Sequence, residues 1–585
     1  MSTLAETPRE ISEPSVHPRT IGISWPFPAQ RQLGVRYKLF IATASLTLFL
    51  GWMTHTVPVG PLIESDYCYQ LMAADRWAHG HGPTALQPVA PHQPWEWSYD
   101  LGFLTQWPIG YSALIAGLRL LFGWTSLEAA RWISVLCCAA ALAGWYQWLR
   151  RMMPQGITGF LLAAAGAATA VPIGHLTNPS TDAILIASVP FVLLLAVGHS
   201  DLPFDNRNQK RHQASPAHVG LLAGGLCWIR YAAVFLPVAI GAFYGWRAWR
   251  RGLSPRRLFE FGFAAALPIA ALLIINGAFG PPTSTQTQFN LGHTTAFNFS
   301  TSILSTTWLN FTDFGFYDHH AFVRRFLTLW PVILVVALLA SRRIRSHLIL
   351  REVPGILALS AVCVASLLGM LVLSTAVFGD KFQFVELDRY YLPIRPLYFA
   401  LFVAPICLLP YRSVRAICCV ALVLVALWIV QVDWARTYSR TMQDPRETTP
   451  YGQWTRCFSP GAAELYGWLR ANAGPDWIIV SNYHEYVALE TGIATLPIPP
   501  DAASLERWTQ RIATTRNVTH PRVVFVLDSD NRWRSHWIPP VPAIIKTFEL
   551  EPLNAVPASI APYLFAKPSQ AAQDHHVARI SWNSS

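Results

Sequence analysis

A few charged side chains stand next to long apolar segments, and they are the residues with which this chain could do chemistry. A charge within or beside a membrane segment is costly, so each one is a candidate functional group. These residues are Asp66, Asp182, Arg230, Glu386, Asp388 and Arg389. The alternation of basic and non-basic loops along the chain assigns all of them to one side of a membrane. Carboxylates in such a place suit proton transfer, and arginines suit phosphate binding.

Asp66 is a candidate general base, and Glu64 stands two residues before it. As a base, Asp66 would take a proton from an acceptor group at the membrane surface. The alternative is a carboxylate in the first turn of a helix, where it stabilises the helix through its dipole. Spacing alone does not decide between these two roles.

Each of the other candidates also has a purely structural alternative. Arg230 would either hold a phosphate or extend its charged end to the lipid headgroups. Arg389 would either face a substrate or pair with a neighbouring carboxylate, and Asp182 would either face a substrate or cap a helix. Trp107 and Tyr111 have the character of interfacial aromatics, which the sequence favours over substrate stacking.

Composition places the chain among membrane proteins. Of its 585 residues, 52% are hydrophobic and 13% are charged. Soluble domains carry roughly 25% charged residues. The apolar runs approach the length of about 20 residues that crosses a bilayer; they cover residues 40–52, 161–171, 184–197, 261–275, 332–340, 356–377 and 416–430. The net charge of +11 does not require nucleic acid, because Lys and Arg gather in the cytoplasmic loops of membrane proteins.

Alternation of basic and non-basic loops predicts about eleven membrane spans. A polar tail over residues 1–36 precedes an uncleaved first span and places the N-terminus in the cytoplasm. The loop over residues 281–322 contains no Lys or Arg, as expected on the outer side. The alternation holds only if residues 218–246 cross twice, as two short spans that meet near Arg230. This arrangement leaves the C-terminus outside.

The transmembrane domain is predicted to cover residues 37–432 and to include an outer juxtamembrane loop at residues 58–125. Within this loop, an interfacial helix is expected over Ser65–Ala78. A second helix should open at Pro108 and end at Gly123. Thr125 and Glu128 have the spacing of a capping box for the next span.

The C-terminal part is predicted to be a small extracytoplasmic α/β domain over residues 458–585, after a linker at 433–457. Strand-like runs at 477–481 and 522–527 alternate with helical stretches, the first of which should start at Ser459. Cys68 and Cys457 are the only cysteines in polar outer segments, and a disulfide between them is the less favoured alternative. No CxxC spacing is present, so no metal site is indicated.

Four stretches taken together resemble the GT-C glycosyltransferases, polytopic enzymes that use polyprenyl-phosphate-linked sugars. Protein O-mannosyltransferases and lipid A aminoarabinose transferases belong to this group. The stretches are Glu64-Ser-Asp66-Tyr with residues 71–80, then residues 106–117, residues 224–231, and Asp388-Arg-Tyr-Tyr-Leu-Pro393. The resemblance covers residues 35 to 435. It departs from the family where Ser65 separates two acids that are adjacent in many members, and the C-terminal domain carries no motif that we can assign.

The resemblance implies sugar transfer from a polyprenyl-phosphate donor to an extracytoplasmic glycan, lipid or protein. Asp66, with Glu64, would be the base, and Arg230 and Arg389 would stabilise the departing phosphate. The remaining candidates would bind substrate: Asp182, Trp107, Tyr111, Glu386 and Asp388. No cofactor is required, because a lipid phosphate is already a competent leaving group, and no nucleotide-binding glycine pattern is present. A divalent metal stays an open alternative that no motif indicates. The expected partners are the bilayer, the lipid-linked sugar and the acceptor, with no nucleic acid.

Two other classes of protein stay open. A transporter would show repeat symmetry and polar groups at mid-membrane, and neither is visible. A non-catalytic scaffold or sensor would bind a partner through its external domain, and for such a protein Asp66 and Arg230 would be dispensable.

Overall fold

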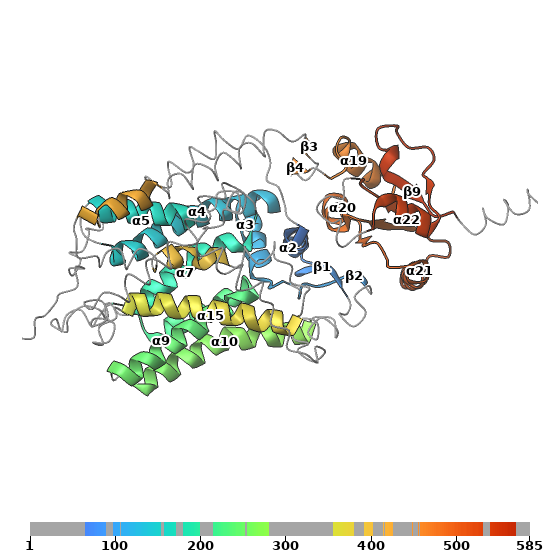
Figure 1. Ribbon diagram of the computed structural model, residues 1–585. Coiled ribbons are helices and arrows are strands. Elements are labelled where there is room, and N and C mark those ends of the chain that lie inside the picture. Colours follow the sequence, from blue (N-terminus) through green and yellow to red (C-terminus); the bar gives the residue numbers. More distant parts are fainter. Residues whose placement is uncertain are drawn as a thin grey trace, which may run out of the picture.

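The computed structural model describes most of the membrane bundle and of the C-terminal part; the described residues are 65–88, 97–105, 107–153, 157–170, 179–198, 214–251, 254–279, 355–378, 391–399, 401, 413–414, 416–424, 447–448, 454–455, 457–529 and 539–568. Figure 1 shows a bundle of apolar helices on one side and an α/β unit on the other, with α2 (Ser65–Ala78) and a short hairpin between them. The predicted first span and loop 281–322 lie outside the described residues, as do Glu64, Glu386, Asp388 and Arg389.

The bundle consists of apolar helices of different lengths; those described are α4 (Ser126–Met152), α5 (Ile157–Ala170), α7 (Thr181–Val197), α8 (Pro216–Gly225), α9 (Phe235–Arg251), α10 (Pro255–Phe279) and α15 (Gly355–Phe378). Among the described residues, three helices are long and apolar enough to cross a membrane: Ser126–Met152, Pro255–Phe279 and Gly355–Leu373. These helices are those of an integral membrane protein. The total of about eleven spans and the domain boundaries stay predictions.

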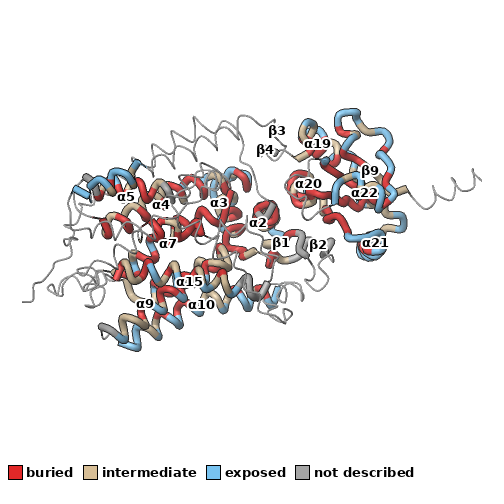
Figure 2. The backbone as a smooth tube through the Cα atoms, in the orientation of Figure 1, coloured by how far each residue is buried: buried red, intermediate tan, exposed pale blue. Residues whose placement is uncertain are grey.

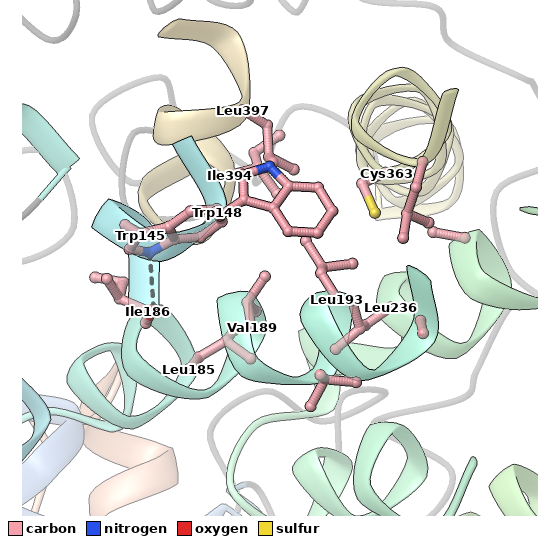
Figure 3. Packing of buried hydrophobic residues seen from close by; sticks show 14 of the residues in the cluster. Trp145, Trp148, Leu185, Ile186, Val189, Leu193, Leu236, Cys363, Ile394 and Leu397 are labelled. Atoms are coloured by element: carbon pink, nitrogen blue, oxygen red, sulfur yellow. Dashed lines mark hydrogen bonds between the residues drawn. The ribbon is translucent and has the colours of Figure 1, made fainter. Parts of the chain in front are cut away.

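The helices pack through a core centred on two tryptophans. Trp145 and Trp148 of α4 are fully buried against α7, and the Trp145 Nε1 donates a hydrogen bond of 3.0 Å to the Ile186 carbonyl (Figure 3). A buried indole N–H needs such an acceptor. Cys363 of α15 and Ile394 of the 3-10 turn η5 (Leu392–Ile394) belong to the same core. Figure 2 shows the buried residues on the inward faces of the bundle.

The outward faces of the bundle keep large apolar side chains exposed. Phe259, Phe263 and Ile274 of α10 are between 62% and 73% exposed. An apolar outer surface of this kind would be unfavourable in water, whereas lipid tails solvate it. Burial on one face and apolar exposure on the other therefore agree with a membrane environment.

The predicted pair of short segments around Arg230 is present as a helical hairpin. Two 3-10 turns, η2 (Leu226–Trp228) and η3 (Tyr231–Val234), separate α8 from α9, and Arg230 between them is extended. α8 runs parallel to α10, because Gly220 lies against Phe261 and Gly224 against Ala265. α9 also packs on α10, with the ring of Tyr244 against that of Phe261. Only residues 252–254 separate the end of α9 from the start of α10, so these two helices run in opposite directions. Arg230 thus lies at the turn of the hairpin.

The hairpin depends on close backbone contact, which yields a matched pair of glycine variants. A Cβ atom at Gly224 would lie 2.2 Å from the Ala265 carbonyl oxygen, whereas one at Gly225 would meet nothing within 4 Å. We expect Gly224→Ala to destabilise the protein by about 1–3 kcal/mol, because the α10 backbone must move. Gly225→Ala should leave stability unchanged or raise it by up to about 1 kcal/mol. Thermal unfolding in detergent measures both, and equal stability of the two variants would contradict the packing of α8 on α10.

Different residues lie at the two ends of the bundle, as the directions of the helices require. The N-termini of α4 and α7 and the Arg230 turn share one end. The basic residues of the described helices are concentrated at the other end; among them are Arg150, Arg151, Arg247 and Arg257. This separation agrees with the predicted alternation of loops, and which end faces the cytoplasm stays a prediction.

A juxtamembrane layer covers the end that carries Arg230. It contains α2, the antiparallel hairpin of β1 (Thr84–Pro88) and β2 (Trp97–Phe103), and α3 (Gly110–Phe122). The bounds of α2 match the prediction, and so do the end of α3 at Gly123 and the capping box of Thr125 and Glu128. α3 begins two residues after Pro108, with Ile109 as its N-cap.

The prediction that α2 has a single apolar face is wrong, while its position in the membrane interface stays a prediction. Residues 67–74 are all buried, because α3 packs against one side of α2 and a helix of the C-terminal unit packs against another. Polar contacts also hold the layer together. Asp75 of α2 forms an ion pair with Arg119 of α3 and accepts a hydrogen bond of 2.5 Å from Ser126 at the start of α4.

The C-terminal unit is a five-stranded mixed sheet with strand order β6-β5-β7-β9-β8. β5 (Trp477–Ser481) is parallel to β6 (Thr495–Leu496) and β7 (Arg522–Val526), while β9 (Leu564–Ala566) is antiparallel to β7 and β8 (Glu551–Pro552). The helices around it are α19 (Ala462–Asn472), α20 (His484–Thr491), α21 (Ala502–Arg516) and α22 (Val541–Phe548).

The two predicted strands lie at β5 and β7. The first helix of the unit, α19, has Gly461 as its N-cap and so starts after the predicted Ser459. In the preceding linker, β3 (Glu447–Thr448) pairs with β4 (Trp454–Thr455). Within the described residues, Cys68 and Cys457 form no disulfide bond.

Candidate functional site

A buried ion pair between Asp182 and Arg230 lies at the centre of the candidate site. Asp182 comes from the first turn of α7 and Arg230 from the hairpin turn, and their side chains are 2% and 11% exposed. The Asp182 Oδ1 accepts from Arg230 Nη1, and its Oδ2 accepts a 3.1 Å hydrogen bond from the Tyr67 hydroxyl of α2. Both carboxylate oxygens therefore have protein partners, and Asp182 fixes where the Arg230 guanidinium lies.

The interpretation of Asp182 as the cap of its helix is wrong. Ser180 is the N-cap, and its Oγ accepts a 3.0 Å hydrogen bond from the Asp182 backbone N–H. The Ser180 hydroxyl also lies 3.0 Å from the Tyr67 hydroxyl. Because Ser180 satisfies the helix end, the Asp182 side chain is available for Arg230 and Tyr67.

Tyr111 of α3 closes one side of this network. It is fully buried, and its ring meets that of Tyr67 edge-on, with the centroids 6.4 Å apart. Burial raises the pKa of Tyr111 well above its ordinary value. The nearby Ser180 amide acts weakly in the opposite direction but lies outside regular hydrogen-bond geometry. Tyr111 therefore stays a neutral phenol and cannot serve as the base.

The start of α3 packs directly on the turn that carries Arg230. A Cβ atom at Gly110 would lie 2.4 Å from the carbonyl oxygen of Trp228 in η2, so only glycine allows this approach. The Trp228 indole in turn donates a 2.8 Å hydrogen bond to the Pro268 carbonyl of α10. The juxtamembrane layer and the hairpin thus fix the position of Arg230 from two sides.

Asp66 is the second residue of α2, immediately before Tyr67. Its backbone therefore lies one residue from the side chain that bonds to Asp182. The late motif re-enters the described residues at Tyr391, which is fully buried, and η5 after it packs against α7. The chain that follows Arg389 thus reaches the helix that carries Asp182.

A second polar chain, which our sequence analysis missed, begins at the residue after Arg230. The Tyr231 hydroxyl donates a 2.8 Å hydrogen bond to the Thr105 carbonyl, and Asn276 Nδ2 of α10 donates a 2.7 Å bond to the same hydroxyl. Thr105 and Asn276 are fully buried. The available signal was Asn276 itself, a polar residue that directly follows the apolar run of residues 261–275.

Trp107 does not present an open face to a substrate on the side of α2. Its ring stacks on Tyr69, with the centroids 4.9 Å apart and an interplanar angle of 18°. The Tyr69 hydroxyl lies 2.9 Å from Nε2 of His484, the first residue of α20. This contact joins the C-terminal unit to the juxtamembrane layer, on the side of α2 away from the bundle.

The structure therefore brings together Tyr67, Tyr111, Asp182 and Arg230, with Asp66 adjacent in the chain. These side chains provide one oriented cation, the Arg230 guanidinium, and the neutral hydroxyls of Tyr67 and Tyr111 as hydrogen-bond donors. Among the described residues, no group of three or more His, Cys, Asp or Glu side chains is arranged to hold a metal ion.

No protein-family model and no curated protein matches this sequence. Solved structures, by contrast, do match this chain in their fold. The chain is similar to ArnT from Cupriavidus metallidurans bound to undecaprenyl phosphate, with a TM-score of 0.53, 12% identity, and coverage of 92% of this chain and 99% of that one.

Two further solved structures are similar at lower TM-scores. The Archaeoglobus fulgidus oligosaccharyltransferase, in complex with Zn and sulfate, gives a TM-score of 0.45 at 15% identity, covering 84% of this chain and 67% of that one. The mycobacterial arabinofuranosyltransferase AftD gives 0.34 at 17% identity, covering 76% and 30%. At these identities the similarity to ArnT shows the fold alone, over nearly the full length of both chains.

Proposed function

From the GT-C fold that this chain adopts, we propose that the protein is a membrane glycosyltransferase. It moves a sugar from a polyprenyl-phosphate donor to an acceptor on the extracytoplasmic side. The observation that carries the proposal is the buried Asp182–Arg230 pair, held at the covered end of the bundle next to the start of α2. A fixed, largely desolvated cation near a helix whose second residue is a carboxylate suits the transfer of a group from a phosphate.

In the proposed reaction, Asp66 takes the proton from the acceptor hydroxyl as its oxygen attacks the anomeric carbon. The bond between that carbon and the phosphate oxygen breaks, and the polyprenyl phosphate leaves with the electron pair. Arg230 and Arg389 stabilise the negative charge that develops on the leaving oxygen. General bases contribute typically 10² to 10⁴ in rate, and a positioned cation contributes a comparable electrostatic effect.

We assign Asp182 a positioning role in this scheme. Its two oxygens are occupied by Arg230 and Tyr67, so it contacts the substrate only through the arginine that it orients. Glu386 and Asp388 stay proposed substrate contacts. The donor lipid follows the class named for the ArnT structure, undecaprenyl phosphate. The acceptor is a glycan, lipid or protein, and the α/β unit at residues 458–585 lies on its side of the membrane.

The direct test compares the lipid-linked sugars and envelope glycans of cells with and without this gene by mass spectrometry. We expect cells without the gene to lose one sugar from an envelope component and to accumulate the matching polyprenyl-phosphate sugar, because its consumer is absent. Unchanged envelope glycans with unchanged lipid-linked sugars would refute the transferase. Loss of uptake or export of a solute, with glycans unchanged, would favour a transporter instead.

A further inference from the structure

The hydroxyl of Tyr231 fixes the orientation of the Asn276 side chain. Its single proton is donated to the Thr105 carbonyl, so a lone pair on its oxygen must receive the hydrogen bond from Asn276. The Asn276 amide therefore turns its Nδ2 towards Tyr231 and its Oδ1 away from it. This assignment follows from the hydrogen bonds alone.

Two polar atoms in this trio have no hydrogen-bond partner among the described residues. The Asn276 Oδ1 and the Thr105 Oγ1 are buried and make no hydrogen bond within the part of the chain that the structure describes. Both residues are 0% exposed. Buried polar atoms without partners are rare in native proteins, and such an atom calls for a ligand, an ion or an ordered water. Two residues that each carry such an atom and each contact one tyrosine mark a candidate site for a polar ligand.

The position of the trio relates it to the proposed transferase site. Tyr231 directly follows Arg230, and Thr105 stands two residues before Trp107 at the end of the β1–β2 hairpin. Asn276 lies in the last turn of α10, at the same end of the bundle. A ligand whose phosphate lies at Arg230 would therefore be bound at the same end of the bundle as Thr105 and Asn276.

The chemistry of the two atoms selects the ligand group. The Asn276 Oδ1 only accepts hydrogen bonds, so its partner must be a donor, whereas the Thr105 hydroxyl can donate or accept. None of the three side chains carries a charge, and a free carbonyl oxygen repels a phosphate. The hydroxyl groups of a sugar meet both requirements.

We propose that Thr105 and Asn276 bind hydroxyl groups of the transferred sugar and determine which sugar the protein accepts. The inference rests on the proposed function, because the sugar is that of the polyprenyl-phosphate donor. The subsite recognises the sugar separately from the phosphate and the lipid.

The test uses Thr105→Val, which removes the hydroxyl but keeps the shape of the side chain and the carbonyl that Tyr231 needs. Binding is measured for undecaprenyl phosphate alone and for undecaprenyl phosphate linked to glucose, mannose or arabinose. The wild-type protein should bind at least one glycosylated lipid more tightly than the bare lipid. Thr105→Val should weaken the binding of that glycosylated lipid by about 3- to 10-fold, as for the loss of one hydrogen bond. The affinity for the bare lipid should stay unchanged.

Asn276→Leu is the second variant, and it should change which sugar is preferred. Ser360→Ala is the matched control: it removes a buried hydroxyl that bonds to the Ile356 carbonyl within α15, and it should alter no affinity. Wild-type affinity of Thr105→Val for each glycosylated lipid, together with a raised unfolding temperature, would show that the site holds only water and would overturn the inference. If Thr105→Val weakens the binding of undecaprenyl phosphate alone by the same factor, the inference is overturned as well.

Binding and transfer separate the two proposals. If the wild-type protein discriminates among the sugars and Thr105→Val removes the discrimination, the subsite stands even where no transfer is measured. Transfer that proceeds at the wild-type KM for every donor in Thr105→Val would support the transferase and refute the subsite.

Discussion

Replacing Asp66 by Asn should lower sugar transfer by at least about a hundredfold while the protein still folds and inserts. The amide cannot accept the proton of the acceptor hydroxyl, so the loss should fall on kcat. Asp66 stands in the first turn of α2, where Asn is also well tolerated. A purely structural carboxylate at this position would therefore give nearly wild-type behaviour, with a cost well under about 1 kcal/mol.

The measurement uses purified protein, undecaprenyl-phosphate sugars and an envelope extract as the source of acceptor. Glu64→Gln serves as the matched control, since it removes the neighbouring carboxylate in the same way and should have a smaller effect. Retained binding of undecaprenyl phosphate shows that Asp66→Asn is folded. Full transfer by this variant would eliminate Asp66 as the base and leave the membrane architecture untouched.

Breaking the Asp182–Arg230 pair should produce the largest loss of stability of any single change at the site. Arg230→Met leaves the Asp182 carboxylate buried at 2% exposure with its main counter-charge gone. Removing one partner of a buried ion pair typically costs about 3–5 kcal/mol. We expect a much lower unfolding temperature in detergent and little folded protein.

The double variant Asp182→Leu with Arg230→Met separates stability from chemistry. Replacing both charges by apolar groups of similar volume should restore most of the stability, because no unpaired charge is left buried. Transfer should stay absent, because the cation at the leaving phosphate is missing. Wild-type transfer by the double variant would show that Arg230 takes no part in the reaction. If the second substitution does not restore stability, Asp182 and Arg230 are not each other's main partner.

The sequence by itself determined features that depend on neighbouring residues. The capping box of Thr125 and Glu128 and the end of α3 at Gly123 are set by side chains within one turn of helix. The bounds of α2 and the positions of β5 and β7 follow from local patterns of apolar and polar residues. The membrane character follows from the length of the apolar runs, because a segment that crosses a bilayer needs a certain length and apolar composition but no particular partner elsewhere in the chain.

Only the tertiary structure decided how the site residues are paired. Asp182 and Arg230 are 48 residues apart, and Tyr69 and His484 are 415 apart. A single sequence does not indicate such contacts, because they depend on how helices cross and where turns place their ends. The same reason explains the error at α2. Its apolar pattern fits a helix lying on a membrane equally well, and only α20, contributed from far along the chain, covers its other side and makes it part of the protein interior.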